Sequence, residues 1–216
     1  ASRSSADILV VDDSSSDGTN ELLALKSREM KQLETITRSA KNGIGSAHLL
    51  ALKKAFESGY DYLITLDADL SHDPQDIPRF LEAVKSANYV VGTRSRGGRT
   101  ELSGFRLILS KGANLVCRII LPTGLSEYTT AYRCYDRKAM ESLISRSPKD
   151  EGYSYFIEAT ELLYRSGLQV SEIPIVFRDR MEGESKIPSF QVFQSTIKII
   201  KLSLSRIRWR LLGDRK

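Results

Sequence analysis

Residues 63–74 read LITLDADLSHDP, an apolar run that ends abruptly in two acids, Asp67 and Asp69, with one small residue between them. A short apolar run bounded by polar residues is typical of a buried β-strand. Two carboxylates that lie close together repel each other, so a strand that ends in them needs a positive partner nearby. The stretch therefore predicts a strand with a charged site at its carboxyl end.

Strand and helix patterns alternate on both sides of this stretch. Their order, β-α-β-α-β-α-β, predicts an α/β protein with a mostly parallel sheet flanked by helices. Such sheets bind ligands beyond the carboxyl ends of their strands, and a second acidic pair, Asp12 and Asp13, ends another of these strands. We expect strands at 7–12, 33–38, 60–67 and 89–93, and helices at 19–31, 44–58 and 74–86.

The second half of the chain is less regular. Its charged loop at 178–186 contains Gly183, and Pro174 interrupts the strand before it. We expect helices at 103–121 and 155–166, and strands at 131–135 and 168–177.

The last thirty residues show one helical stripe, because their apolar positions recur in alternating steps of three and four. We therefore divide the chain into a domain at 1–187 and a basic amphipathic helix at 188–216. Two interpretations of this helix stay open: it docks on the domain, or it lies at a membrane surface or in a partner's groove. The stripe consists of Phe190, Phe193, Ile197, Ile200, Leu204, Ile207 and Leu211.

Composition sets limits on the class of protein. The chain has 216 residues, 41% of them hydrophobic, with a formal net charge of +5 and a pI of about 9.2, which suits anionic partners. Cys117 and Cys134 form no CxxC pair, so we expect neither a disulfide framework nor a cysteine zinc site. We find no signal peptide and no run of about twenty apolar residues that would span a membrane.

The acidic clusters suit a hard divalent cation such as Mg²⁺, which prefers oxygen ligands and often shares them with substrate phosphates. Arginines and lysines in other loops offer the matching positive charge for a phosphate. No Ser/His/Asp or Cys/His set stands out, and we expect His48 and His72 to be structural or exposed to solvent. The loop cations are Arg94, Arg96, Arg99, Arg106, Lys111, Arg180 and Lys186.

Together these residues resemble the dolichol-phosphate mannose synthases and their bacterial polyprenyl-phosphate relatives, which are inverting family-2 glycosyltransferases with a Rossmann-like GT-A fold. The first two of the stretches that carry the resemblance are widespread in family 2, and the last two are more particular to the polyprenyl-phosphate group. The similarity runs from Ile8 to about Pro188. The four stretches are 10–19, 67–74, 106–114 and 180–186.

The resemblance implies a site for a nucleotide-sugar donor. Asp13 and the Val11 backbone would hold the nucleoside, and Ala68 would also contact the substrate. Asp67 and Asp69 would flank the diphosphate and bind Mg²⁺ or Mn²⁺, with Ser71 where some relatives have a glutamine ligand.

The resemblance also implies a set of cations for the two phosphate groups. Arg94 would meet the donor diphosphate, as would Arg180 and Lys186 from a loop that can close. Arg106 and Ser110 would hold the phosphate of the lipid acceptor. Asp69, Arg94 and Arg106 are the expected catalytic residues.

The reaction implied is inverting transfer of a hexose, mannose first, from a nucleotide-sugar, GDP-mannose first, to a polyprenyl or dolichyl monophosphate. The acceptor phosphate is already anionic, so no strong general base is needed. The resemblance places the protein on the cytoplasmic face of the plasma membrane or the endoplasmic reticulum. It would reach the membrane surface, or a membrane-anchoring subunit, through its C-terminal helix.

The sequence departs from the family pattern in two places. Relatives begin with another strand, which should pair near the middle of the sheet, whereas this sequence starts at Ala1 directly before the family's second strand. Relatives also carry an Asp before a Gly-Ser-Phe-Arg run, and here residues 126–133 read SEYTTAYR, with Glu127 in place of that acid.

Three alternatives therefore stay open. A family-2 enzyme with UDP-glucose or another donor and a soluble saccharide acceptor would need a base, with Glu127 or Asp136 as candidates. Loss of the first strand would leave an inactive nucleotide-sugar-binding protein. A nucleic-acid binder is disfavoured because the aromatic residues are not interleaved with the basic ones as stacking platforms.

Overall fold

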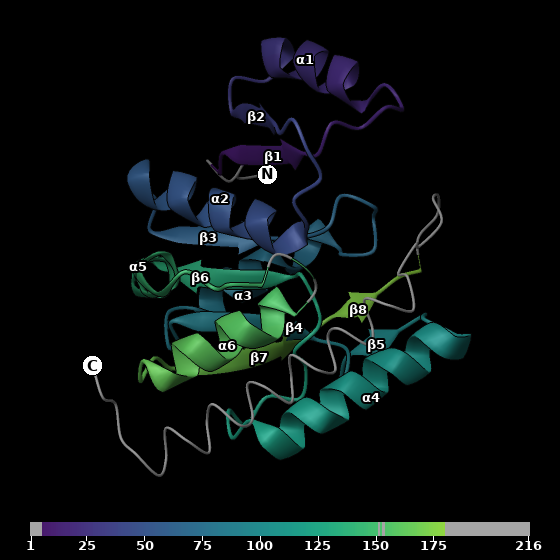
Figure 1. Ribbon diagram of the computed structural model, residues 1–216, viewed down its shortest axis with the longest axis vertical. Coiled ribbons are helices and arrows are strands. Elements are labelled where there is room, and N and C mark those ends of the chain that lie inside the picture. The colour runs from purple at the N-terminus through teal and green to yellow at the C-terminus, as the bar shows by residue number, and fades with distance from the viewer. Residues whose placement is uncertain (1–5, 151, 153, 180–216) are drawn as a thin grey trace.

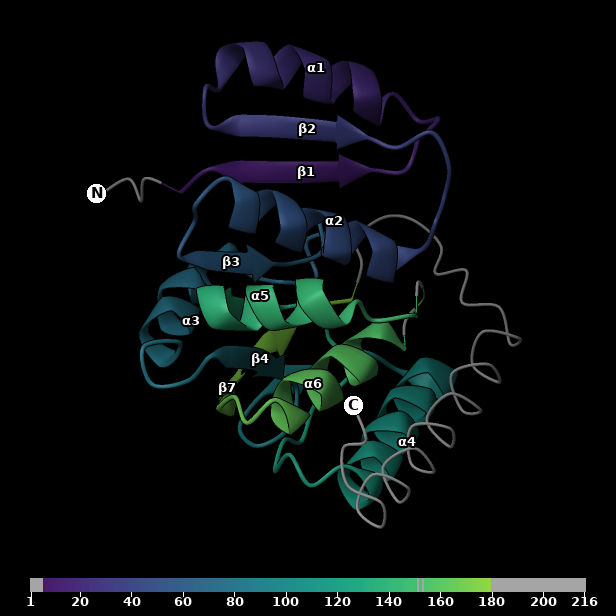
Figure 2. The same ribbon diagram turned by 60° about the vertical axis from the view of Figure 1, so that its left-hand side comes forward.

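The structure is a computed structural model that describes residues 6–150, 152 and 154–179. Two strands and one helix form a lobe above a larger body that contains the other elements (Figures 1 and 2). The lobe consists of β1 (Ile8–Asp12), α1 (Thr19–Glu29) and β2 (Leu33–Thr37). The body consists of α2 (Ile44–Glu57), β3 (Tyr62–Thr65), a 3₁₀ turn at Pro74–Asp76, α3 (Ile77–Ala83), β4 (Tyr89–Thr93), β5 (Arg99–Thr100), α4 (Gly104–Ile120), β6 (Arg133–Asp136), α5 (Arg137–Arg146), α6 (Tyr155–Arg165), β7 (Val170–Pro174) and β8 (Val176–Phe177).

The central sheet has the strand order β3-β6-β4-β7. Strand β6 runs antiparallel to both β3 and β4, whereas β4 and β7 are parallel. Because β3 and β4 both oppose β6, they point the same way, and their carboxyl ends meet at one edge of the sheet. The α/β class is confirmed, whereas the central sheet is mixed because of its reversed strand β6, which the alternating pattern did not predict.

Hydrophobic side chains pack on both faces of this sheet. On one face, α2, α5 and α6 cover it, with Leu52, Met140 and Leu163 fully buried against Tyr89 and Tyr135. On the other face, Phe80 of α3 and Val84, the residue directly after this helix, belong to a second cluster. Helices therefore flank the sheet on both sides, as expected.

Strands β1 and β2 form a separate parallel pair. Figure 2 shows β1 between β2 and β3, and the Tyr60 hydroxyl donates to the Asp7 carboxylate beside the amino end of β1. Within the described ranges, no ladder joins β1 to β3. The sequence resemblance predicts that relatives have a further strand near the middle of this sheet. The described residues do not test that prediction.

Most predicted elements are present, with ends that shift by a few residues. The sequence patterns missed α5, which starts immediately after β6, and the short strand β5. The expected helix at 188–216, and with it the proposed domain boundary, lies outside the described residues. No helix in the described part of the chain is long and apolar enough to cross a membrane.

Candidate active site

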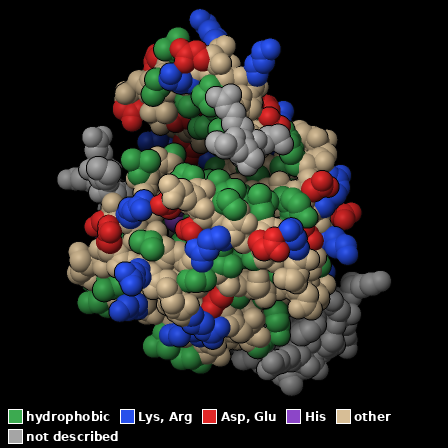
Figure 3. Space-filling model, turned by 180° about the vertical axis from the view of Figure 1, so that it is seen from behind, with side chains coloured by type: hydrophobic (Ala, Val, Ile, Leu, Met, Phe, Trp, Pro, Cys, Tyr) green, Lys and Arg blue, Asp and Glu red, His purple; other side chains and the backbone are tan. Residues whose placement is uncertain are grey.

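Functional side chains gather at the edge where β3 and β4 end. Thr65 at the end of β3 and Val91 near the end of β4 both pair with Arg133, the first residue of β6. The segment before β6 therefore lies beside the segments that follow β3 and β4. In Figure 2, strand β1 points in the same direction as β3. From behind, a hollow separates the upper lobe from the body, with acidic and basic side chains around it (Figure 3).

The acidic loop after β3 turns sharply at Leu70, which has a left-handed φ of 64°. This conformation is unfavourable for a branched side chain and is kept only where the surroundings impose it. The turn brings Ser71 back to Asp69: the Ser71 hydroxyl donates to Asp69 Oδ1 at 2.5 Å, and its amide donates to the same oxygen at 3.1 Å. Ser71 is fully buried, so it fixes the orientation of Asp69.

His72 also holds the acidic loop after β3 in place. Its Nδ1 accepts a hydrogen bond from the Asp67 amide at 3.1 Å, and its Nε2 lies 3.3 Å from Thr130 Oγ1. Burial lowers the pKa of His72 to about 4, against a partly opposing effect of the Asp69 carboxylate. A neutral imidazole with Nδ1 as acceptor is the form that this geometry requires, so His72 is structural, as expected of it.

Arg94, which follows β4, is held in a two-point ion pair. Its Nε donates to Glu127 Oε2 and its Nη2 donates to Glu127 Oε1, each at 2.8 Å. Nη2 also donates to Thr129 Oγ1 at 2.6 Å, and the guanidinium lies 5.2 Å from the ring centre of Phe177. Among the described residues, the hydrogen bonds of Arg94 use Nε and Nη2, which leaves Nη1 for a ligand.

Glu127 is only 1% exposed and collects several donors. Asn114 Nδ2 on α4 donates to Oε1 at 2.8 Å, and the Thr129 amide donates to the same oxygen at 3.0 Å. Burial raises the pKa of Glu127, but the Arg94 guanidinium and the hydrogen bonds from Arg94 and Thr129 outweigh it, so the pKa lies below its ordinary value. A carboxylate held in this way is a weak proton acceptor.

The acids after β1 have different partners. Asp12 is 8% exposed, and the hydroxyl and amide of Ser15 hold the pKa of its carboxyl below the usual value. Asp13 forms an ion pair with Arg38, which also donates to the Gly43 carbonyl at 3.2 Å. Arg38 therefore ties the Asp13 segment to the start of α2. Val11 is the β1 residue that pairs with Ile36 of β2.

The expected acceptor residues lie on the first turns of α4. Arg106 Nη1 is 3.1 Å from Asp179 Oδ1, a contact between two half-exposed side chains that joins α4 to the segment after β8. Ser110 lies one turn further along the helix and is partly buried. Arg180 and Lys186 lie outside the described residues.

The donor set for a metal consists of two carboxylates. Within 6–150, 152 and 154–179, no group of three or more His, Cys, Asp and Glu side chains is placed to hold a metal ion. Asp67 and Asp69 supply hard oxygen ligands in the loop after β3, and Mg²⁺ is commonly bound by one or two carboxylates together with substrate phosphates. The residues present therefore fit a divalent cation that is shared with a diphosphate.

Asp136, a candidate base for a soluble acceptor, lies at the wrong edge of the sheet. It pairs with Tyr62 at the amino end of β3, caps α5 by accepting from the Ala139 amide at 2.7 Å, and accepts from Asn88 Nδ2 at the same distance. The sequence could not show this, because it did not reveal that β6 is reversed. Asp136 is therefore excluded as a base for this site.

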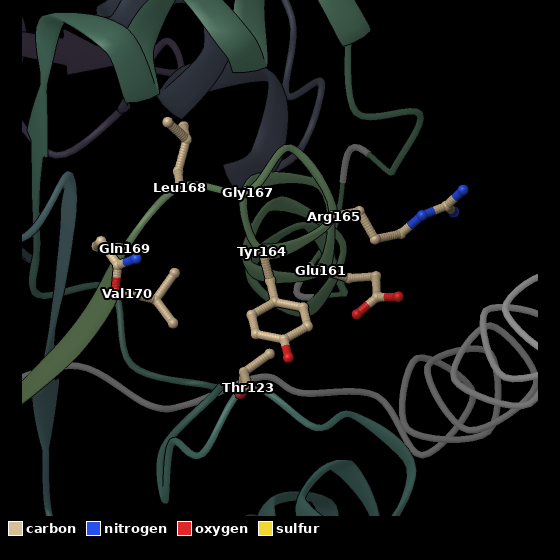
Figure 4. Close-up of a pocket in the computed structure, with 8 residues that line it drawn as sticks. All are labelled: Thr123, Glu161, Tyr164, Arg165, Gly167, Leu168, Gln169 and Val170. Carbon is tan, nitrogen blue, oxygen red and sulfur yellow. The ribbon is translucent and has the colours of Figure 1, made fainter. Parts of the chain in front are cut away.

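A separate pocket of about 400 Å³ also lies away from this edge (Figure 4). Gln169 and Val170 line it at the amino end of β7, where the Gln169 carbonyl accepts from the Tyr89 amide at the start of β4. Tyr164 and Thr123 face each other across it. Its position opposite the acidic loops separates it from the candidate site.

Three residues that support the site were not assigned this role from the sequence: Arg38, Asn114 and Thr130. Asn114 carried a signal, since it lies with Cys117 on the buried face of an otherwise amphipathic helix, where a polar side chain needs a specific partner. Arg38 and Thr130 carried none, because their partners are distant in the sequence.

An α/β fold with acids at its strand ends agrees with a glycosyltransferase, and comparison with known proteins shows that class. The profile of the family "Glycosyl transferase family 2" matches residues 2–144, and the chain belongs to this family. The chain is 32% identical over 212 residues to the undecaprenyl-phosphate mannosyltransferase of Micrococcus luteus, covering 97% of this chain and 87% of that protein. It is 34% identical over 196 residues to the polyprenol monophosphomannose synthase of Mycolicibacterium smegmatis, covering 89% and 74%.

Solved structures confirm the GT-A fold. Glucosyl-3-phosphoglycerate synthase from Mycobacterium tuberculosis superimposes with a TM-score of 0.64 at 18% identity, over 93% of this chain and 68% of that one. Mannosyl-3-phosphoglycerate synthase from Rubrobacter xylanophilus gives a TM-score of 0.64 at 20% identity, over 97% and 66%. The M. tuberculosis enzyme has also been solved with Mn²⁺ and uridine diphosphate.

Proposed function

We propose that this glycosyltransferase transfers mannose, with inversion, from GDP-mannose to a polyprenyl monophosphate at a membrane surface. The observation that carries the proposal is the state of Glu127. A neutral sugar hydroxyl would need a base, whereas Glu127, the candidate base at this edge, is committed to Arg94. An acceptor phosphate is already anionic and needs none. The names of both polyprenol-linked relatives support this choice of acceptor and sugar.

The reaction we propose is a single displacement. An oxygen of the acceptor phosphate forms a bond to the anomeric carbon of the sugar from one face. The bond from that carbon to the β-phosphate oxygen breaks on the opposite face, and the nucleoside diphosphate leaves with the electron pair. Attack and departure on opposite faces invert the configuration, and no proton has to move.

In this proposal, Asp13 and the Val11 backbone hold the nucleoside, while Asp67 and Asp69 hold Mg²⁺ or Mn²⁺. The bound ion would offset the negative charge on the leaving diphosphate. Ser71, expected as a third ligand, orients Asp69 through its hydrogen bonds.

Four cations complete the proposed site. Arg94 presents Nη1 to the donor diphosphate, together with Arg180 and Lys186. Arg106 and Ser110 hold the acceptor phosphate. When this phosphate binds, it replaces Asp179 as the partner of Arg106. Preorganised cations of this kind stabilise charge that develops in the transition state and reduce repulsion between two anionic substrates.

The test is transfer of radiolabelled mannose from GDP-mannose to a polyprenyl phosphate in detergent, with Mn²⁺ or with a chelator. We expect Asp69→Asn to lower transfer by about 100-fold or more. The matched control is Asp61→Asn, which removes an exposed carboxylate near the opposite end of β3 and should leave transfer unchanged.

Three results would contradict this proposal in different ways. Transfer that continues in the presence of the chelator would show that the reaction needs no metal ion. Transfer from UDP-glucose but not from GDP-mannose would show that the donor sugar is not mannose. Transfer to a soluble saccharide but not to a lipid phosphate would show that the proposed acceptor is wrong.

A further inference from the structure

Helix α4 carries three polar side chains along one face. Arg106, Ser110 and Asn114 follow one another at intervals of four residues, so they lie within about 80° of one another around the helix. Asn114 and Cys117 are the buried residues of α4, which identifies this face as the one directed at the body. Each interval corresponds to about 6 Å along the helix axis. The two residues proposed for the acceptor phosphate and the buried asparagine therefore form a row with a fixed spacing.

Asn114 joins α4 to the loop before β6 through both ends of its amide. Its Nδ2 donates to Glu127 Oε1 at 2.8 Å, and its Oδ1 accepts from the Tyr128 amide at 2.8 Å. Asn114 is only 6% exposed, so little water competes for these bonds. Aspartate at this position would offer acceptors alone, and leucine would offer neither group. The two bonds hold the helix and the loop in one relative position.

The other end of this connection is Arg94. Both carboxylate oxygens of Glu127 accept from the Arg94 guanidinium, and a two-point pair of this kind fixes geometry as well as charge. A continuous chain of hydrogen bonds therefore runs from α4 through Asn114 and Glu127 to Arg94. It connects the helix proposed to hold the acceptor phosphate to the arginine proposed to hold the donor diphosphate.

The part of α4 that holds Arg106 and Ser110 precedes Asn114, the first buried residue of the helix. The helix lies along one side of the body in both ribbon views (Figures 1 and 2). Arg106 itself contacts Asp179, but these side chains are 36% and 46% exposed, and exposed ion pairs contribute little energy. Because Arg106 lies about 12 Å from Asn114 along the axis, a tilt of about 10° at Asn114 would move it by about 2 Å.

We infer that Asn114 is a positioning residue that sets the separation of the two phosphate subsites, because it ties α4 to Arg94 through Glu127. Transfer requires the attacking oxygen to lie in line with the anomeric carbon, and a misplacement of about 1 Å can lower the rate by about 100-fold. The assignment of Arg106 to the acceptor and of Arg94 to the donor rests on the proposed function, whereas the anchoring of α4 does not.

The first test is a kinetic comparison of wild type with Asn114→Leu, in which the leucine side chain is of similar size and forms no hydrogen bond. Each subsite stays assembled in this variant, so KM for GDP-mannose and for polyprenyl phosphate should stay within about threefold of wild type. The turnover number kcat should fall by about 100-fold, because the two substrates no longer lie in line. An unchanged kcat, or a loss that appears only in KM, would contradict the inference.

Two further variants show whether the loss passes through Glu127. Asn114→Asp keeps an acceptor for the Tyr128 amide but places a carboxylate against Glu127, so it should lower kcat at least as far as Asn114→Leu. The matched control is Cys117→Ala, which loosens the same buried face of α4 without removing these hydrogen bonds and should leave kcat unchanged. Full activity of Asn114→Asp would show that the bond to Tyr128 suffices. An equal loss of kcat in Cys117→Ala would reduce Asn114 to a packing role.

A distance measurement separates this inference from the proposed function, since it needs no substrate. Nitroxide labels at Glu82→Cys on α3 and Lys111→Cys on α4, both exposed positions, report where α4 lies on the body. The native Cys117 and Cys134 are buried and stay in place. Double electron–electron resonance should give one narrow distance with Asn114 present, and a distribution that is broadened or shifted by about 2 Å in Asn114→Leu.

The distance and the activity together distinguish the possible failures. An unchanged distance distribution in Asn114→Leu would overturn the inference, whatever the activity of wild type. If the distribution changes, yet wild type mannosylates no polyprenyl phosphate, the proposed acceptor fails and the anchoring of α4 by Asn114 stands.

Discussion

Arg94 and Glu127, 33 residues apart in the sequence, form a two-point ion pair in which the arginine side chain is 9% exposed and the glutamate side chain 1%. A buried charge that loses its partner is strongly destabilising, because no water replaces the lost contact. The pair therefore fixes both the position of the cation and the shape of the loop before β6.

The first prediction concerns this pair. Glu127→Gln should lower the free energy of unfolding by about 3 kcal/mol, since it leaves the Arg94 charge uncompensated. Transfer activity should fall by about 100-fold through misplacement of Arg94. Urea denaturation and initial-rate assays measure the two effects. The control is Glu82→Gln, which changes an exposed glutamate on α3.

A double variant separates charge from packing. Arg94→Met/Glu127→Met should recover most of the stability lost in Glu127→Gln, because it removes both charges together, but it should stay inactive. A stable and active double variant would show that the pair has no part in the reaction.

The second prediction concerns Arg133, which is fully buried at the start of β6. Its guanidinium donates to the carbonyls of Tyr128, Thr130 and Phe156 at 2.6, 2.7 and 3.0 Å. Arg133→Met removes the arginine donors to the buried Tyr128 and Thr130 carbonyls, so the free energy of unfolding should fall by about 3–5 kcal/mol. Chemical denaturation tests this expectation.

Arg133→Lys keeps the charge but not the planar fork, and it should recover only part of the loss. Full recovery by lysine would show that the charge alone matters at this position.

The third prediction concerns the turn after Arg94. A Cβ placed on Gly98 would lie 2.0 Å from the Thr93 carbonyl oxygen and 2.9 Å from the Arg94 Cα. Gly98→Ala must therefore displace backbone that carries Arg94, and we expect a loss of about 1–3 kcal/mol together with reduced activity. Melting temperature and transfer rate provide the measurement.

Gly112→Ala is the matched control, because no residue that the structure describes lies within 4 Å of its Cβ position on α4. It should be neutral or raise stability by about 0.5–1 kcal/mol, as alanine favours helix. Equal damage from both substitutions would argue against a tight turn at Gly98.

The fourth prediction is a pH dependence. His48 lies against the rings of Tyr155 and Phe156, and burial together with the charge of Arg133 lowers its pKa from 6.5 to about 3. Below pH 6.5 the unfolded chain binds a proton on His48 that the native protein does not. Stability is therefore fully present above this pH and decreases as the pH falls toward 3.

Between pH 7.5 and pH 5.5, this one group should remove about 1 kcal/mol from the free energy of unfolding. His48→Gln cannot titrate, so its loss over the same interval should be smaller by that amount in urea titrations. Identical pH dependence in the two proteins would mean that the pKa of His48 is the same in the native and unfolded states.

Local patterns predicted much of the fold correctly because strands and helices here follow their hydrophobic periods closely. The strand at 89–93 matches β4 at both ends. Helix α5 was missed because its first turn follows β6 without a loop, and its polar residues obscure the period. Strand β6 was expected, but its direction depends on pairing with β3 and β4, which no local pattern encodes.

The sequence by itself determined the α/β class, the placement of acids at strand ends and membership in a glycosyltransferase family, since periodicity and short motifs are local properties of the chain. Only the tertiary structure decided that Glu127 is committed to Arg94, that Asp136 lies at the opposite edge and that Asn114 joins α4 to Glu127. These features depend on strand direction and on contacts between residues far apart in the sequence, which burial and pairing fix only once the whole sheet has assembled.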